Sequence, residues 1–197
     1  TMTTPRGFHT ATLLPNGLVL LTGGIINSSS LVAVDTTEVY DPTANTFTAL
    51  SATMTSLRNQ HTTTLLPNGQ VLIAGGSNNG NGDGLYTAEL YNPATQTFTA
   101  LTATMTTPRG GHTATLLPNG QVLVTGGTVS FSVNNFTALN TAELYDPVSN
   151  TFTALTATMT TPRCCQRATL LPNGRVLLTG GGSTLTVLNT AEVYGIQ

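Results

Sequence analysis

The sequence repeats one unit of about fifty residues four times. Each copy carries Leu-Leu-Pro-Asn-Gly and then, after a short apolar run, a Gly-Gly pair; the pairs begin at Gly23, Gly75, Gly126 and Gly180. A period near fifty residues is typical of propeller blades, whereas helical solenoids have shorter units. We therefore expect one domain over residues 1–197, with repeats at about 1–52, 53–103, 104–157 and 158–197.

Within one unit the local signals predict four antiparallel strands, A to D. Residues 112–117 are rich in β-branched types and predict strand A, and the continuous apolar run 70–76 predicts strand B. Between A and B, Pro-Asn-Gly is typical of a tight hairpin, because Gly takes the position with positive φ. Residues 87–93 predict strand C, and 95–105 predict strand D after an Asn-Pro turn.

The unit resembles the kelch repeat, the blade of β-propellers that include galactose oxidase. Its Gly-Gly pair, its Glu-x-Tyr phrase and its aromatic residue after the turn carry the resemblance, which covers all four copies. Phenylalanine stands where the family often has tryptophan, at Phe47, Phe98 and Phe152. The resemblance implies an all-β propeller of four four-stranded blades, although kelch propellers usually close with six or seven.

The fourth unit stops after strand C, so we expect the last blade to lack its outermost strand. Three explanations stay open: a ring closed by a three-stranded blade, a chain that is part of a longer protein, or a strand supplied by another chain. An unpaired strand edge favours pairing with other strands. Self-association is therefore one expected partnership.

Composition excludes some partners and leaves others. Only 7% of the residues are charged, with a formal net charge of −2, so no basic stripe is available for nucleic acid. No apolar run approaches the roughly 20 residues that a membrane-spanning helix needs, and residues 1–10 do not resemble a signal peptide. A polar surface of Thr, Ser and Asn favours an extracellular or cell-surface location.

Eight of the fourteen charged side chains recur at equivalent positions in the four units. We expect one structural Arg–Glu contact per repeat, because a catalytic site would be unique. The expected pairs are drawn from Arg6, Arg58, Arg109 and Arg163 with Glu38, Glu89, Glu143 and Glu192.

Three histidines, His9, His61 and His112, follow the arginines at equal spacing, and Gln166 takes the fourth place. If strand A is innermost, a ring of metal ligands is conceivable. Strand side chains point toward neighbouring blades, however, so a hydrogen-bonded packing role is favoured. We expect no metal and no cofactor.

The alternating strand direction places A–B and C–D turns on one face and B–C and D–A connections on the other. The B–C loops share no sequence, and variable loops on a rigid frame are the usual place for binding. Asn79, Asn81 and Asp83 fit the opening of a calcium loop, although a flexible connection is favoured. Phe131 and Phe136, expected to be exposed on a loop, are candidates for a contact surface.

Cys164 and Cys165 are the two cysteines of the chain and stand side by side in the fourth D–A connection. A bond between neighbouring cysteines would close a strained eight-membered ring. Such a ring could form a rigid pad for a ligand, and two free thiols are the favoured alternative. We include both residues among the candidate ligand-binding residues.

These observations favour a non-catalytic binding or scaffold module that contacts a protein or a glycan through its variable loop face. One alternative is a structural subunit that assembles through the open blade edge. The other, implied by the likeness to galactose oxidase, is a fragment of a copper-radical oxidase. That chemistry needs Tyr and His ligands and a Tyr–Cys cross-link, yet four of the five tyrosines are the repeated strand C residue.

Overall fold

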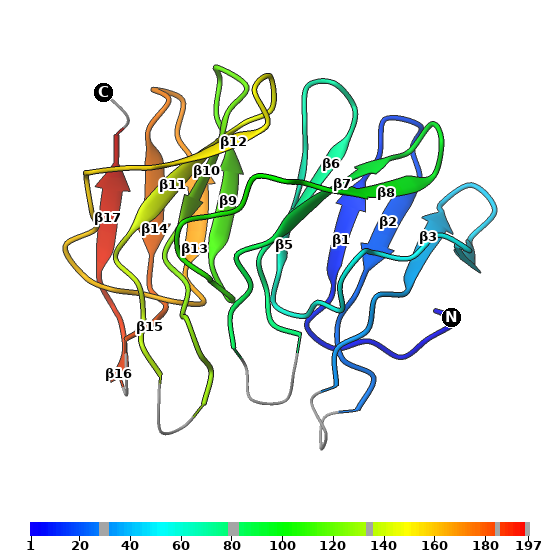
Figure 1. Ribbon diagram of the computed structural model, residues 1–197, viewed down its shortest axis with the longest axis horizontal. Coiled ribbons are helices and arrows are strands. Elements are labelled where there is room, and N and C mark those ends of the chain that lie inside the picture. Colours follow the sequence, from blue (N-terminus) through cyan, green and yellow to red (C-terminus); the bar gives the residue numbers. More distant parts are fainter. Residues whose placement is uncertain (28–31, 79–82, 133–135, 184–185, 196–197) are drawn as a thin grey trace.

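The structure, a computed structural model, describes residues 1–27, 32–78, 83–132, 136–183 and 186–195. Within these ranges every regular element is a β-strand. The strands form four antiparallel sheets that stand side by side in chain order, as the blades of a propeller (Figure 1). Three blades have four strands and the last has three, so the predicted all-β architecture and the shorter fourth blade are confirmed.

Strands follow the order A, B, C, D from the inside of each blade outward. Blades 1 and 2 contain β1 (Thr10–Leu13), β2 (Val19–Thr22), β3 (Thr37–Asp41), β4 (Thr46–Ala49), β5 (Thr62–Leu65), β6 (Val71–Ala74), β7 (Ala88–Asn92) and β8 (Thr97–Ala100). Blades 3 and 4 contain β9 (Thr113–Leu116), β10 (Val122–Thr125), β11 (Ala142–Asp146), β12 (Thr151–Ala154), β13 (Arg167–Leu170), β14 (Val176–Thr179) and β17 (Ala191–Tyr194). A short ribbon of β15 (Gly182–Ser183) and β16 (Thr186–Val187) lies in the B–C loop of blade 4.

The Pro-Asn-Gly hairpin is held by local contacts that the repeat supplies in every blade. In blade 1 the Leu14 N–H donates to the Leu18 carbonyl at 2.8 Å, and Gly17 has a φ of 85°. The Asn16 Oδ1 accepts the N–H of Leu18 at 3.1 Å. Glycine adopts this φ without a Cβ penalty, so the tripeptide closes a tight turn.

Strand D is shorter than predicted. In blade 2 it covers Thr97–Ala100 rather than residues 95–105. Beyond it, the Met105 N–H bonds to the Tyr86 carbonyl at 2.9 Å, and the Met105 side chain is buried in the core between blades 2 and 3. Because Met105 is buried in the junction between blades 2 and 3, the chain leaves the sheet after Ala100. The residues that favour a strand continue beyond that point.

The cores of the molecule lie between blades rather than within them. Each blade has a trailing face, on which the next blade packs, and a leading face, which packs on the blade before it. Between blades 1 and 2 the trailing face supplies Leu14 and Leu20, and the leading face supplies Val71, Ile73 and Tyr91. Equivalent clusters fill the other two junctions, so each blade is stabilised by its neighbours.

A buried Arg–Glu ion pair stands at the same place in each blade. Arg58 Nε lies 2.8 Å from Glu89 Oε1, and both side chains are fully buried. The Arg58 guanidinium also donates to the carbonyls of Gly75 and Thr87 at 2.9 and 3.0 Å. The other pairs are Arg6–Glu38, Arg109–Glu143 and Arg163–Glu192. Each arginine thus fastens the D–A connection to the B–C loop of its own blade.

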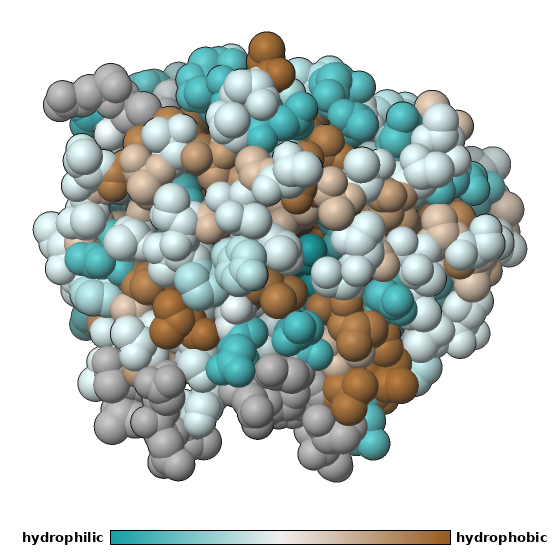
Figure 2. Space-filling model, in the orientation of Figure 1, coloured by the Kyte–Doolittle hydropathy of each residue, from teal (hydrophilic) through white to brown (hydrophobic). Residues whose placement is uncertain are grey.

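The two ends of the blades differ in character. The A–B turns lie at the upper edge of Figure 1, and the B–C loops lie at the lower edge. The face shown in Figure 2 is mostly of intermediate hydropathy, with polar and apolar spots, as a chain rich in threonine and poor in charge predicts. Among the described residues no helix is long and apolar enough to cross a membrane.

Candidate functional site

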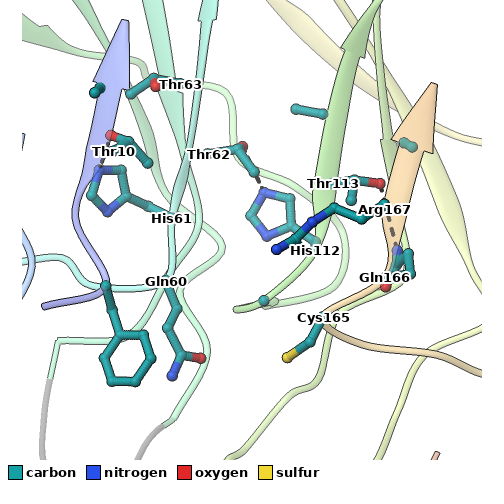
Figure 3. A pocket seen from close by; sticks show the side chains of 15 residues that line it. Thr10, Gln60, His61, Thr62, Thr63, His112, Thr113, Cys165, Gln166 and Arg167 are labelled. Carbon is teal, nitrogen blue, oxygen red and sulfur yellow. Dashed lines mark hydrogen bonds between the residues drawn. The ribbon is translucent and has the colours of Figure 1, made fainter. Parts of the chain in front are cut away.

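A groove of about 610 Å³ runs along the innermost strands of all four blades (Figure 3). Each blade contributes its strand A and the residues just before that strand, from β1, β5, β9 and β13. The inner strands of adjacent blades contact one another, so the groove has a continuous floor. It lies where the axial channel of a propeller would be.

Four equivalent positions line the groove just before strand A, occupied by Phe8, Gln60, Gly111 and Cys165. All four have a left-handed backbone, with φ of 55°, 53°, 61° and 57°. Their peptide groups form a ladder from blade to blade, in which the N–H of Gln60, Gly111 and Cys165 donates to the carbonyl of the preceding position at 2.7–3.0 Å.

A left-handed backbone is uncommon for residues other than glycine and costs free energy. Three of these four positions nevertheless carry a side chain, and all four residues are different. The backbone is therefore constant here while the side chain varies. This combination indicates positions that set what the groove contacts.

Phe131 lies against Gly110 and Gly111, next to the groove position of blade 3. A Cβ on Gly111 would lie 2.9 Å from Phe131 Cζ, so the glycine makes room for the ring. Phe136 meets Phe131 edge to face, with ring centroids 6.4 Å apart. Both rings are half-buried. The expectation that they are exposed was wrong, because glycines at 110 and 111 leave a hollow that an aromatic ring fills.

The two cysteines are free thiols in different surroundings. Cys164 is buried and Cys165 is exposed in the groove, with their Sγ atoms 3.3 Å apart. Cys164 bridges to Gly182 through two backbone hydrogen bonds of 2.8 and 2.9 Å. The hydrogen bond from the Cys164 thiol lowers the pKa of Cys165 to about 7 against the opposing effect of burial, and the Arg167 charge adds to this shift. The same contact and burial raise the pKa of Cys164.

We expect Cys165 to be alkylated by iodoacetamide with a pH midpoint of about 7. The thiolate is the nucleophile, so the rate falls as the pH drops below that value. Replacing Cys164 with alanine removes the hydrogen-bond donor and is expected to raise the midpoint by more than one pH unit, toward the ordinary value near 8.5. A Cys165→Ala protein, which keeps the buried thiol, serves as the unreactive control. A midpoint unchanged by Cys164→Ala would contradict the assignment.

The buried histidines bond to threonine hydroxyls of the preceding blade. His61 Nε2 lies 2.9 Å from the hydroxyls of Thr10 and Thr22, and His112 Nε2 lies 2.8 Å from that of Thr62 (Figure 3). Gln166 takes the same place in blade 4 and donates to the Thr125 carbonyl at 2.9 Å. In the described part of the chain no group of three or more His, Cys, Asp or Glu side chains could hold a metal ion.

The residues that fit the opening of a calcium loop are described only in part. Asn79 and Asn81 lie outside the described residues. Asp83 is described and forms an isolated bridge with Ser130 of the next blade. Its backbone therefore links the B–C loops of blades 2 and 3.

Arg167 is a groove residue that the sequence reasoning missed. It is exposed, takes part in none of the four Arg–Glu pairs, and extends from β13 in the direction of β9 (Figure 3). The equivalent residues in the other blades are Thr10, Thr62 and Thr113. A charge that replaces a repeated threonine was the available signal. Phe8 and Gln60 were also missed as groove residues. They are equivalent to Cys165, and the variation among the three side chains was the available signal.

A second hollow of about 430 Å³ lies at the opposite end of the blades. It is lined by the Pro-Asn-Gly turns of blades 2 and 3 and by Asp146, Pro147 and Val148. Half of its lining residues belong to the repeated Pro-Asn-Gly turn, so the other blades present the same groups. This hollow offers less variety for recognition than the groove.

The radial sheets, the inter-blade cores and the axial groove define the chain as a β-propeller repeat protein. The model of the Kelch motif family matches residues 61–104, which contain the four strands of blade 2. The other three blades repeat the same sequence phrases and the same strand order, so the match and the four-bladed architecture together support a kelch-repeat β-propeller. No curated protein matches the chain.

Proposed function

We propose that the chain is a non-catalytic binding module that holds a segment of a partner protein in the axial groove, at the end where the B–C loops lie. The observation that carries this proposal is the set of four positions with one backbone conformation and four different side chains, Phe8, Gln60, Gly111 and Cys165. Kelch propellers are commonly protein-binding scaffolds and are generally non-catalytic.

The groove chemistry favours a partner segment with an acidic side chain beside an apolar one. Among the described residues Arg167 is exposed and takes part in none of the Arg–Glu pairs, and a guanidinium binds carboxylates through charge-assisted hydrogen bonds. Phe8 is 58% exposed and presents an aromatic surface. Between them lie threonine hydroxyls and the amide of Gln60.

The experiment selects binders from a displayed peptide library and measures their affinity for variants of the chain. Arg167→Ala is expected to weaken binding about tenfold, because it removes a charge-assisted hydrogen bond, and Phe8→Ala is expected to weaken it through lost apolar contact. Both side chains are exposed, so these substitutions should leave the fold intact.

Val148→Glu is the matched control, since Val148 is 92% exposed at the opposite hollow. Selected peptides that bind equally well to the Arg167 and Phe8 variants would contradict the proposal, and loss of binding in the Val148 variant would move the site to the opposite hollow. A parallel glycan array tests the other ligand class. Selective retention of a glycan, with no peptide binding, would show that the ligand is a glycan and not a protein.

We also propose that the module is displayed outside the cell or at its surface. The low content of charged residues and the threonine-rich surface support this location. Fractionation of the source cells, followed by detection of the chain in the medium or on intact cells, tests it. Recovery only from the interior of the cell would contradict it.

A further inference from the structure

The two ends of the blade array present uncovered faces. Blade 1 and blade 4 stand at opposite ends of the row (Figure 1). The trailing face of blade 4 includes Leu171, Leu177 and Val193, and the leading face of blade 1 includes Met2, Leu13 and Tyr40. Leu21, which also belongs to the leading face of blade 1, is already buried. In each of the three internal junctions, the equivalent faces are packed against each other.

The trailing face of blade 4 is exposed where its equivalents are buried. Val193 is 51% exposed, whereas the equivalent Leu90 in blade 2 is 9% exposed. Leu177 is half-buried, while its equivalents are each 1% exposed: Leu20, Leu72 and Leu123. A Cβ on Gly180 would meet only the Leu188 carbonyl, at 3.5 Å. The same atom on Gly75 would meet the backbone, the histidine and the methionine of the next blade.

The leading face of blade 1 is exposed in a matching way. Met2 is 36% exposed, and its equivalents, which fill the internal junctions, are 2–3% exposed: Met54, Met105 and Met159. Leu13 is 62% exposed, whereas the equivalents Leu65 and Leu116 pack into junction cores. The methionine position is therefore buried wherever a neighbouring blade is present, whereas the leucine position remains partly exposed, as Leu170 at 39% shows.

Backbone groups at the two faces are complementary as well. At each internal junction the second glycine of the Gly-Gly pair donates to the arginine carbonyl of the next blade, at 2.8–2.9 Å for Gly24, Gly76 and Gly127. That arginine N–H donates back to a B–C loop carbonyl, as Arg163 does to Leu139 at 3.0 Å. Among the described residues, Gly181 N–H, Leu188 carbonyl and both backbone groups of Arg6 have no such partner. Donors and acceptors on the two faces therefore match.

We propose that the leading face of blade 1 docks on the trailing face of blade 4 of a second copy of this chain. In that contact Gly181 N–H donates to the Arg6 carbonyl, and Arg6 N–H donates to the Leu188 carbonyl. Met2 enters the apolar junction, as Met54, Met105 and Met159 do inside the chain. The occupant is a second copy because the surface that fits blade 4 is the one that blade 1 presents.

The contact is head-to-tail, so one interface leaves one face open on each copy. Head-to-tail contacts close into a ring when the rotation between copies permits it. Two copies supply eight blades, which is within the range of known propellers. The two-copy ring is the smallest assembly without an open face. The junction between two copies differs from the internal junctions at Arg167. This residue replaces the threonine whose hydroxyl bonds to the histidine of the next blade.

Sedimentation velocity across a concentration series tests the proposal. The unmodified chain is expected to form a species of twice the chain mass of 20.4 kDa. Val193→Glu places a charge on the trailing face and Met2→Glu places one on the leading face, and each variant is expected to be monomeric. Both side chains are exposed in a single copy, so circular dichroism and thermal unfolding of the monomer should stay unchanged.

A mixture of the two variants distinguishes this contact from other dimers. The Val193→Glu protein keeps an intact blade 1, and the Met2→Glu protein keeps an intact blade 4, so the mixture is expected to form a one-interface dimer that neither forms alone. Val148→Glu, at a side chain that is 92% exposed and away from both faces, is expected to dimerise like the unmodified chain. A monomer at all concentrations would overturn the proposal and leave the faces to another partner. Self-association that survives both variants would also overturn it.

Discussion

Lowering the pH from 6.5 to 4.5 is expected to reduce the free energy of unfolding by about 2–3 kcal/mol for each of His61 and His112. Both imidazoles are buried against the preceding blade, and the pKa of each is lowered to about 3. Burial is the largest cause. The positive charges of Arg58 and Arg109 add to it for His61 and His112 respectively.

The sign follows from proton binding. In the unfolded chain a histidine takes up a proton near pH 6.5, while in the folded chain these two stay neutral until about pH 3. Between those values the unfolded state binds more protons, so stability is lost as the pH falls. Asp and Glu side chains ordinarily titrate near pH 4, so they contribute only at the lower end of this window. Urea unfolding at a series of pH values measures the loss.

Blade 4 supplies the control, because Gln166 occupies the histidine position and keeps a hydrogen bond to the blade before it. A protein with His61→Gln and His112→Gln is expected to remain folded and to show a nearly flat stability between pH 6.5 and 4.5. If the double variant loses as much stability as the unmodified chain over this range, the histidines do not cause the acid sensitivity.

Replacing Arg109 with methionine is expected to lower the free energy of unfolding by about 3–5 kcal/mol. Arg109 is fully buried and its Nη2 lies 2.8 Å from Glu143 Oε1. Burial lowers the pKa of Arg109, and the hydrogen bond and charge of Glu143 oppose that shift. Methionine fills part of the volume but leaves the Glu143 carboxylate buried without a counter-charge. Denaturant unfolding at neutral pH measures the loss.

Two further variants separate the charge from the packing. Arg163→Met in blade 4 is expected to cost less, because its partner Glu192 has a side chain 17% exposed, so water can solvate the carboxylate. Adding Glu143→Gln to Arg109→Met should recover part of the loss, since it removes the charge and keeps one oxygen as an acceptor for the Thr106 N–H. Equal losses in the two blades, with no recovery in the double variant, would indicate that packing alone is responsible.

Several features of the fold could be predicted because they depend on local chemistry. The Pro-Asn-Gly phrase defines a hairpin by the φ preferences of its own residues, and the apolar run at Val71–Ala74 reads as a strand covered on both faces. The outer limit of strand D could not be predicted in this way. The residues after Ala100 continue to favour a strand. The strand pairing ends there because Met105 is buried in the junction between blades 2 and 3.

The candidate site shows the same division. Two positions follow the repeated arginine in each blade, and the cysteines at 164 and 165 showed that these positions vary. The sequence did not show that the first of the two is turned inward and that the second lines the groove. That separation comes from the left-handed backbone at the second position, held by hydrogen bonds between blades. The half-buried position of Phe131 likewise depends on the hollow above Gly110 and Gly111.

The sequence by itself determined that this protein is a fourfold tandem of antiparallel sheets, because turns, strand composition and period are short-range properties repeated in the chain. Only the tertiary structure decided which side chains of a blade meet the next blade, which line the groove, and which remain uncovered at the two ends. Those properties depend on the packing of one blade against another. The equivalent leucine or methionine belongs to the core in the middle of the array and to the surface at its ends.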